Sequence, residues 1–100
     1  MPPDGPAAPA ERQRLDRWLF FARAVKSRTL AQKLIESGAV RVNAQRVTAS
    51  DRQVGPGDVL TMMLGRRLVV WRIQAAAKRR GPPAEAATLY EDLTPALPRP

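Results

Sequence analysis

The chain has 100 residues with no cysteine and no histidine, and 17 lysine and arginine residues against 9 acidic ones give it a formal net charge of +8. This composition excludes disulfides, thiolate chemistry, zinc fingers and imidazole catalysis, and the length is typical of one small domain. We therefore expect a protein that is not an enzyme and has no metal and no cofactor. The excess of positive charge favours nucleic acid as the partner.

Proline and charge divide the chain into three parts. Four of the 10 prolines lie at positions 2–9 and five at positions 82–100. We expect a disordered N-terminal tail at 1–13, a folded domain at 14–80, and a C-terminal segment at 81–100 with a short helix and a proline-rich end. Residues 12–80 hold 16 basic and four acidic residues, a net charge of +12, so the folded part carries the basic character. No signal peptide or membrane span is expected, and we predict a cytoplasmic protein.

Two amphipathic helices are predicted first in the chain. The first, at about 15–25, has an apolar stripe with helical spacing formed by Leu15, Trp18, Leu19 and Ala22. The second begins with Ser27 or Thr29 as its cap and ends where Gly38 follows Ser37. Its apolar residues are Leu30, Ala31, Leu34 and Ile35.

A small antiparallel sheet is predicted next. Valines alternate with arginines around 43–45, which indicates two short strands and a tight turn. The turn sequence at 55–58 precedes a strand at 59–64, and a further turn at 65–67 precedes a strand at 68–73. Residues 84–93 have the composition of a last short helix.

The apolar pattern also predicts the core. The residues expected there are Leu15, Trp18, Leu19, Ala22, Leu34, Ile35, Val40, Val42, Val59 and Leu64, with Trp71, Met62 and Met63 also packed. Phe20 and Phe21 point more outward, and a platform for base stacking is the less favoured alternative to packing. Asp16, in the first turn of the first helix, is expected to accept backbone hydrogen bonds or to orient an arginine.

The candidate binding residues lie between positions 12 and 46, where nine basic residues meet two acidic ones. Arginine suits phosphate because its planar fork matches the phosphate oxygens, and Ser27 opens a helix whose free amides add an anion site. Asn43 and Gln45 are weaker candidates for contacts to a base edge or a 2′-hydroxyl. The alternative is a solvated basic face that serves solubility. The candidates are Arg12, Arg14, Arg17, Arg23, Lys26, Ser27, Arg28, Lys33, Arg41, Asn43, Gln45 and Arg46.

A longer pattern resembles the S4 RNA-binding domain over residues 14–64. It consists of Arg14-Leu15-Asp16-Arg17-Trp18-Leu19, Ala22-Arg23, Lys26-Ser27-Arg28, Ala31, Leu34-Ile35, Gly38, Val40-Arg41-Val42-Asn43 and Gly57-Asp58. The resemblance implies an α+β fold, with two packed helices against a small antiparallel sheet. It also implies that the first helix, the start of the second and the following hairpin bind structured RNA.

The segment 84–91, after a basic stretch at 78–80, is similar to the small ribosome-associated heat-shock proteins of this family. That resemblance implies a non-catalytic protein that binds RNA of the large ribosomal subunit, and helps to recycle stalled subunits that carry peptidyl-tRNA under heat stress. We expect the protein to be a monomer. A general nucleic-acid binder, for DNA or RNA, is the alternative, because phosphate attraction does not depend on sugar or sequence. One position departs from the family: Asn43-Ala44 replaces the usual Asn-Gly, which makes another type of turn the alternative to type I′.

Overall fold

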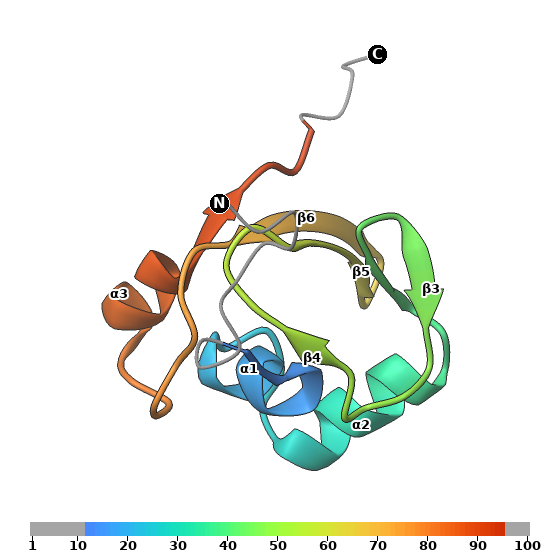
Figure 1. Cartoon of the computed structure of the whole chain (residues 1–100), viewed down its shortest axis with the longest axis horizontal. Helices are drawn as coiled ribbons and strands as arrows, with labels where there is room; N and C mark the ends of the chain where they lie inside the picture. Colours follow the sequence, from blue (N-terminus) through green and yellow to red (C-terminus); the bar gives the residue numbers. More distant parts are fainter. Residues whose placement is uncertain (1–11, 96–100) are drawn as a thin grey trace, which may run out of the picture.

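Two short helices lie under a curved antiparallel sheet in the computed structural model, which describes residues 12–95 (Figure 1). The helices are α1 (Leu15–Phe21) and α2 (Arg28–Glu36). The sheet has the strand order β3-β2-β5-β6-β7, and each neighbouring pair is antiparallel. Its strands are β2 (Val40–Val42), β3 (Gln45–Val47), β5 (Val59–Leu64), β6 (Arg67–Ile73) and β7 (Tyr90–Asp92). The predicted α+β fold is confirmed.

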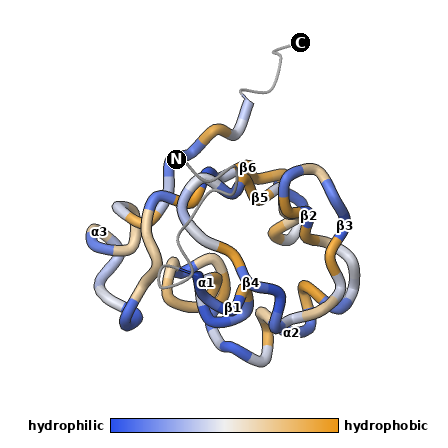
Figure 2. Tube along the Cα trace, viewed as in Figure 1, coloured by the Kyte–Doolittle hydropathy of each residue, from blue (hydrophilic) through white to orange (hydrophobic). Residues whose placement is uncertain are grey.

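A second, two-stranded sheet joins the start of the chain to its middle. In it β1 (Gln13–Arg14) pairs with β4 (Gln53–Val54) near α1, and Figure 2 shows a hydrophilic β1 beside a β4 that includes the buried, hydrophobic Val54. Sequence analysis missed this sheet because two-residue strands are too short for an alternating pattern. Gln13, assigned to the tail by the predicted boundary, is also tied to Ala77 by two hydrogen bonds of 2.7 and 3.0 Å. Residues 1–11 of the predicted tail lie outside the described residues.

The helices begin where predicted, but α1 is shorter than expected. It ends at Phe21, because Ala22 is its cap and Arg23 has a φ of 64°, which a helix cannot continue. The second helix starts after Ser27, whose hydroxyl accepts a hydrogen bond of 3.1 Å from the amide of Leu30. It ends before Gly38, which has a φ of 83°.

The core lies between the helices and the sheet. Seven of the ten residues predicted for it are buried, as are Met62 and Trp71. Leu34, Val59 and Leu64 are only half-buried, and Met63 is exposed, which corrects the prediction. Val59 lies on the outer face of β5, because Leu60 and Met62 alternate with it and point inward, and Leu64 is the last residue of its strand. The buried seven are Leu15, Trp18, Leu19, Ala22, Ile35, Val40 and Val42.

The β2–β3 hairpin keeps the tight turn in spite of its alanine. Val42 pairs with Gln45, so Asn43 and Ala44 form a two-residue loop with φ angles of 52° and 71°. Two positive φ angles are typical of a type I′ turn, so the alternative turn is wrong. The Asn43 side chain donates to Asp58 at 2.9 Å and accepts from the amide of Val59 at 2.9 Å, which fixes the loop to the start of β5.

The C-terminal segment is less helical than predicted. A single α-helical turn, α3 (Pro83–Ala86), and a 3-10 turn, η2 (Ala87–Leu89), replace the helix expected at 84–93. Tyr90 then has extended backbone, pairs with Ile73, and stacks its ring on Trp71 with centroids 3.7 Å apart. Tertiary pairing therefore overrides helical propensity here. Residues 96–100 of the predicted proline-rich end lie outside the described residues. Within residues 12–95, no helix is long and apolar enough to cross a membrane.

Candidate nucleic-acid interface

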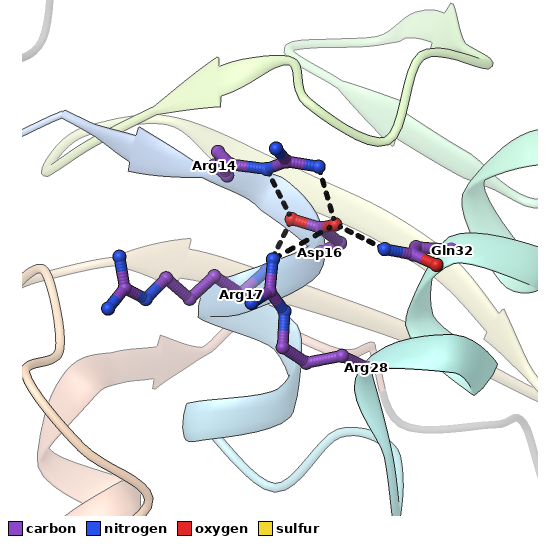
Figure 3. A network of polar contacts seen from close by, with 5 residues as sticks. All are labelled: Arg14, Asp16, Arg17, Arg28 and Gln32. Atoms are coloured by element: carbon purple, nitrogen blue, oxygen red, sulfur yellow. Dashed lines mark hydrogen bonds and ion pairs between the residues drawn. The ribbon is translucent and has the colours of Figure 1, made fainter.

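One buried carboxylate at the start of α1 binds two arginine side chains and the backbone amide of a third arginine (Figure 3). The Asp16 side chain is fully buried and accepts hydrogen bonds from Arg14 Nε at 3.1 Å and Arg14 Nη2 at 3.0 Å. Arg28, at the start of α2, forms an ion pair with the same carboxylate at 3.5 Å. The backbone amide of Arg17 and the Gln32 amide group donate to it at 2.7 and 3.0 Å. We call Arg14, Arg17 and Arg28 the arginine cluster.

These contacts keep Asp16 ionised. Burial alone raises the pKa of this carboxyl, but the hydrogen bonds from Arg14, Gln32 and the Arg17 amide outweigh burial and hold its pKa below the usual value. In return, the hydrogen bond with Asp16 raises the pKa of Arg14. Asp16 thus fixes two guanidinium groups, those of Arg14 and Arg28, around one anion, and it holds Arg17 only through the backbone amide.

The arginine cluster keeps donors free for a ligand. The side chains of Arg14 and Arg28 are 43% and 44% exposed, so Asp16 orients their guanidinium groups without covering them. Arg17 is exposed, and its side chain makes no hydrogen bond or ion pair with residues 12–95. A guanidinium group that is held in place and partly exposed matches phosphate oxygens, because its planar fork loses little freedom on binding.

Two further arginines face each other on the β2–β3 hairpin. Arg41 and Arg46 are directly opposite in the ladder, and both are exposed. Like charges in this position destabilise a hairpin, so the pair favours a negatively charged partner over a structural role. The Arg46 guanidinium lies against Gly38, so a side chain at position 38 would require it to move. We call Arg41 and Arg46 the hairpin pair.

Several predicted binding residues already have partners within the protein. Arg23 Nε donates to the carbonyl of Gly81 at 2.7 Å, and Arg12 donates to the carbonyl of Gln53 at 3.4 Å. The Ser27 hydroxyl caps α2, and the Asn43 amide holds the hairpin loop. These contacts favour structural roles for the four side chains.

The remaining predicted binding residues lie on the surface. Lys26, Lys33 and Gln45 are exposed, and their side chains form no hydrogen bond or ion pair with another described residue. No contact of that kind links the hairpin pair to the arginine cluster within 12–95 either. The structure therefore unites Arg14, Arg17 and Arg28, while the contribution of the other predicted residues stays a prediction.

Sequence reasoning missed Gln32 and Arg80. Gln32 lies one turn along α2 from Arg28 and completes the shell around Asp16. Arg80 donates to the carbonyls of Phe20 at 3.1 Å and Val25 at 3.3 Å, which fastens the C-terminal segment to the end of α1. The spacing of Arg28 and Gln32 on one face of α2 could have indicated the first, but nothing local to residue 80 indicates the second.

Similar known proteins identify the family of this chain and support its fold. Residues 13–60 match the S4 domain family. Heat shock protein 15 of Escherichia coli (strain K12) is 40% identical over 84 residues, which are 84% of this chain and 62% of that protein. The RQC P-site tRNA stabilizing factor of Bacillus subtilis (strain 168) is 36% identical over 77 residues, which are 77% of this chain and 87% of that protein.

A solved structure supports the same assignment. Heat shock protein 15 of Vibrio cholerae, described as trimeric, superposes with a TM-score of 0.77 at 34% identity, and the match covers 82% of each chain. The chain spans less than two thirds of the length of the Escherichia coli relative.

Proposed function

Because the chain belongs to the S4 domain family, together with heat shock protein 15 and the RQC P-site tRNA stabilizing factor, we propose that it is a non-catalytic protein that binds RNA. The observation that carries this proposal is the arginine cluster, in which a buried carboxylate orients cations that remain exposed. Phosphate contacts of this kind supply affinity and fix the position of a protein on nucleic acid.

The proposed partner is RNA of the large ribosomal subunit, in a subunit that has stalled under heat stress and still carries peptidyl-tRNA. The name of the Bacillus subtilis relative refers to P-site tRNA, and the names of other relatives refer to heat shock. Because the domain is small, selectivity should come from the shape of the RNA at a site that intact ribosomes occlude. A ribosomal partner would place the protein in the cytoplasm.

Binding to ribosomal fractions tests this proposal. We expect the tagged protein to recover large subunits with peptidyl-tRNA after heat stress in preference to intact ribosomes. Arg17→Glu should weaken recovery, because it reverses the charge of a side chain that forms no hydrogen bond or ion pair with the described residues. Arg66→Glu, on the β5–β6 turn, is the control and should have little effect. Arg28→Glu is less informative, because it would bring a second carboxylate to Asp16.

Other outcomes would contradict the proposal in distinct ways. Equal recovery of intact ribosomes and separated subunits would remove the recycling role. Binding only to duplex DNA would favour the general nucleic-acid binder. The monomer expected from the sequence stays a prediction, and light scattering of the purified protein would distinguish it from a trimer such as the Vibrio cholerae relative.

A further inference from the structure

Two adjacent phenylalanines at the end of α1 have different surroundings. Both rings are half-buried, and their centroids are 5.8 Å apart. The Arg80 guanidinium lies 4.8 Å from the centre of the Phe20 ring and also donates to two backbone carbonyls, so it is fixed over that ring. The guanidinium of Arg17 lies 5.5 Å from the centre of the Phe21 ring. Phe20 is therefore covered by Arg80, which hydrogen bonds hold in place, whereas Phe21 is covered by Arg17, whose side chain forms no hydrogen bond or ion pair with the described residues.

The Arg17–Phe21 pair is open to a ligand. Arg17 and Phe21 are four residues apart on α1, so their side chains meet on one face of the helix. The Arg17 side chain is exposed and forms no hydrogen bond or ion pair within residues 12–95, which leaves its five N–H donors and the outer plane of its guanidinium available. By contrast, the core aromatics Trp18, Trp71 and Tyr90 pack on one another.

We propose that Arg17 and Phe21 form a stacking platform for one unpaired base of the bound RNA, an inference that rests on the proposed function. Bases stack on aromatic rings and on guanidinium planes, and a ring at the edge of a cationic surface brings the base and its flanking phosphates to the protein together. Arg17 belongs to the arginine cluster, because its backbone amide donates to Asp16, so the platform adjoins Arg14 and Arg28. Arg14 and Arg28 are then close enough in the fold to bind phosphates of the same RNA.

This geometry also indicates which RNA is preferred. In a continuous double helix every base is covered by its neighbours, so no base face is free to stack on a side chain. A bulge, a loop or a frayed end offers such a face beside a helix whose phosphates remain available. The platform therefore selects structured RNA with an unpaired nucleotide, and separates it from duplex of the same charge.

The test compares two RNA hairpins that differ by one nucleotide. Both have the same stem and the same loop; the stem of one is fully paired, and the stem of the other carries a single bulged 2-aminopurine, whose fluorescence falls when it stacks. We expect wild-type protein to prefer the bulged hairpin and to quench its fluorescence. Phe21→Leu should lower affinity for the bulged hairpin by about 5- to 150-fold, the range measured for loss of one stacked base, and should abolish quenching. It should leave the salt dependence of binding unchanged, because no charge is removed.

Phe20→Leu is the matched control, because Arg80 already covers that ring. It should bind the bulged hairpin like the wild type. Phe21→Trp keeps an aromatic face and should keep both the preference and the quenching, which separates stacking from a general change in packing. If Phe21→Leu binds and quenches like the wild type, the platform is wrong and the RNA-binding proposal stands. If wild-type protein binds neither hairpin and no ribosomal RNA, the proposed function fails and the platform fails with it.

Discussion

Asp16 is the residue on which the candidate interface depends. It is fully buried, and its two oxygens accept hydrogen bonds from Arg14, Gln32 and the backbone amide of Arg17. Arg28 adds an ion pair. Burying a carboxylate is costly unless it is paired and hydrogen-bonded, and here every buried side-chain polar atom of the described residues has a partner. Asp16 therefore both stabilises the fold and sets the positions of the arginines.

Asp16→Asn tests this role through stability. The amide keeps the shape of the carboxylate, but it is uncharged and replaces one acceptor oxygen with a donor, so the ion pairs with Arg14 and Arg28 are lost. We expect the free energy of unfolding to fall by about 1 to 3 kcal/mol. A urea titration at neutral pH measures the change. Glu36→Gln, at an exposed carboxylate on α2 without an ion pair in the described structure, is the control and should change stability little. Equal effects of the two variants would contradict the role.

The same carboxylate should make stability depend on pH. Its pKa is lower in the folded state than in the unfolded chain, so the folded state binds fewer protons. The stabilisation is then fully present above the ordinary pKa of an aspartate, and is lost as the pH falls through the lowered pKa. We expect urea titrations on acidification to show a smaller loss of stability for Asp16→Asn than for the wild type. Parallel pH curves would contradict this.

Residue roles were predictable from the sequence where they depend on local position. The place of Asp16 in the first turn of a helix was enough to predict that it accepts a backbone hydrogen bond or orients an arginine, and it does both. The roles of Arg23 and Asn43 depend on partners 58 and 15 residues away, so no local pattern indicated them. Their side chains serve the fold in places where charge and polarity alone suggested RNA contacts.

At the scale of elements, periodicity predicted the helix starts and the long strands, because those segments bury one face. It failed for β1, β4 and β7, which are two or three residues long and owe their structure to pairing with distant segments. The segment 84–93 shows the same limit: its helical composition holds for one turn and then yields to the pairing of Tyr90 with Ile73.

The hairpin loop offers a stabilising substitution. Ala44 has a φ of 71°, a left-handed conformation that costs a residue with a side chain about 1 kcal/mol or more relative to glycine. We expect Ala44→Gly to raise the free energy of unfolding by up to about 1 kcal/mol in a urea titration. Ala76→Gly, at an exposed residue without a positive φ, should instead lower it, because glycine only adds freedom to the unfolded chain. The same sign for both variants would contradict the explanation.

The last strand is expected to stabilise the whole sheet. Tyr90 stacks on Trp71 and meets Trp18 edge to face, and Gln74 and Leu93 add backbone hydrogen bonds around it. Tyr90→Ala should lower the free energy of unfolding by about 2 to 4 kcal/mol, which thermal or urea unfolding can measure. Tyr90→Phe keeps the ring and should cost far less. A stable Tyr90→Ala variant would mean that the C-terminal segment is dispensable for folding.

At the scale of the whole molecule, net charge predicts attraction to nucleic acid but not the place of contact. The structure divides the basic residues by what else they do. Arg23 and Arg80 donate to backbone carbonyls, and Arg72 and Arg79 each pair with one carboxylate, Glu91 and Glu85. In the arginine cluster, by contrast, two guanidinium groups share the single carboxylate of Asp16, and the side chain of Arg17 and the hairpin pair are exposed. The number of exposed cations on the helices and the hairpin, and not the net charge, should therefore set the electrostatic part of RNA binding.

The salt dependence of RNA binding tests that division. Among the predicted binding residues, the arginine cluster and hairpin pair supply five exposed cations, and Lys26 and Lys33 bring these candidate phosphate contacts to seven. If about 5 to 7 phosphates are neutralised, the logarithm of the binding constant should fall with the logarithm of salt concentration at a slope of about −4 to −6. Arg46→Gln should make the slope shallower by about 1, since it removes one phosphate contact. Arg79→Gln removes the same charge from the chain, but Arg79 lies outside the predicted binding residues and its charge is matched by Glu85, so its slope should match the wild type. Filter binding of one ribosomal RNA fragment at several salt concentrations measures all three slopes. A wild-type slope near zero, or an equal change in both variants, would mean that these exposed arginines do not form the RNA contact.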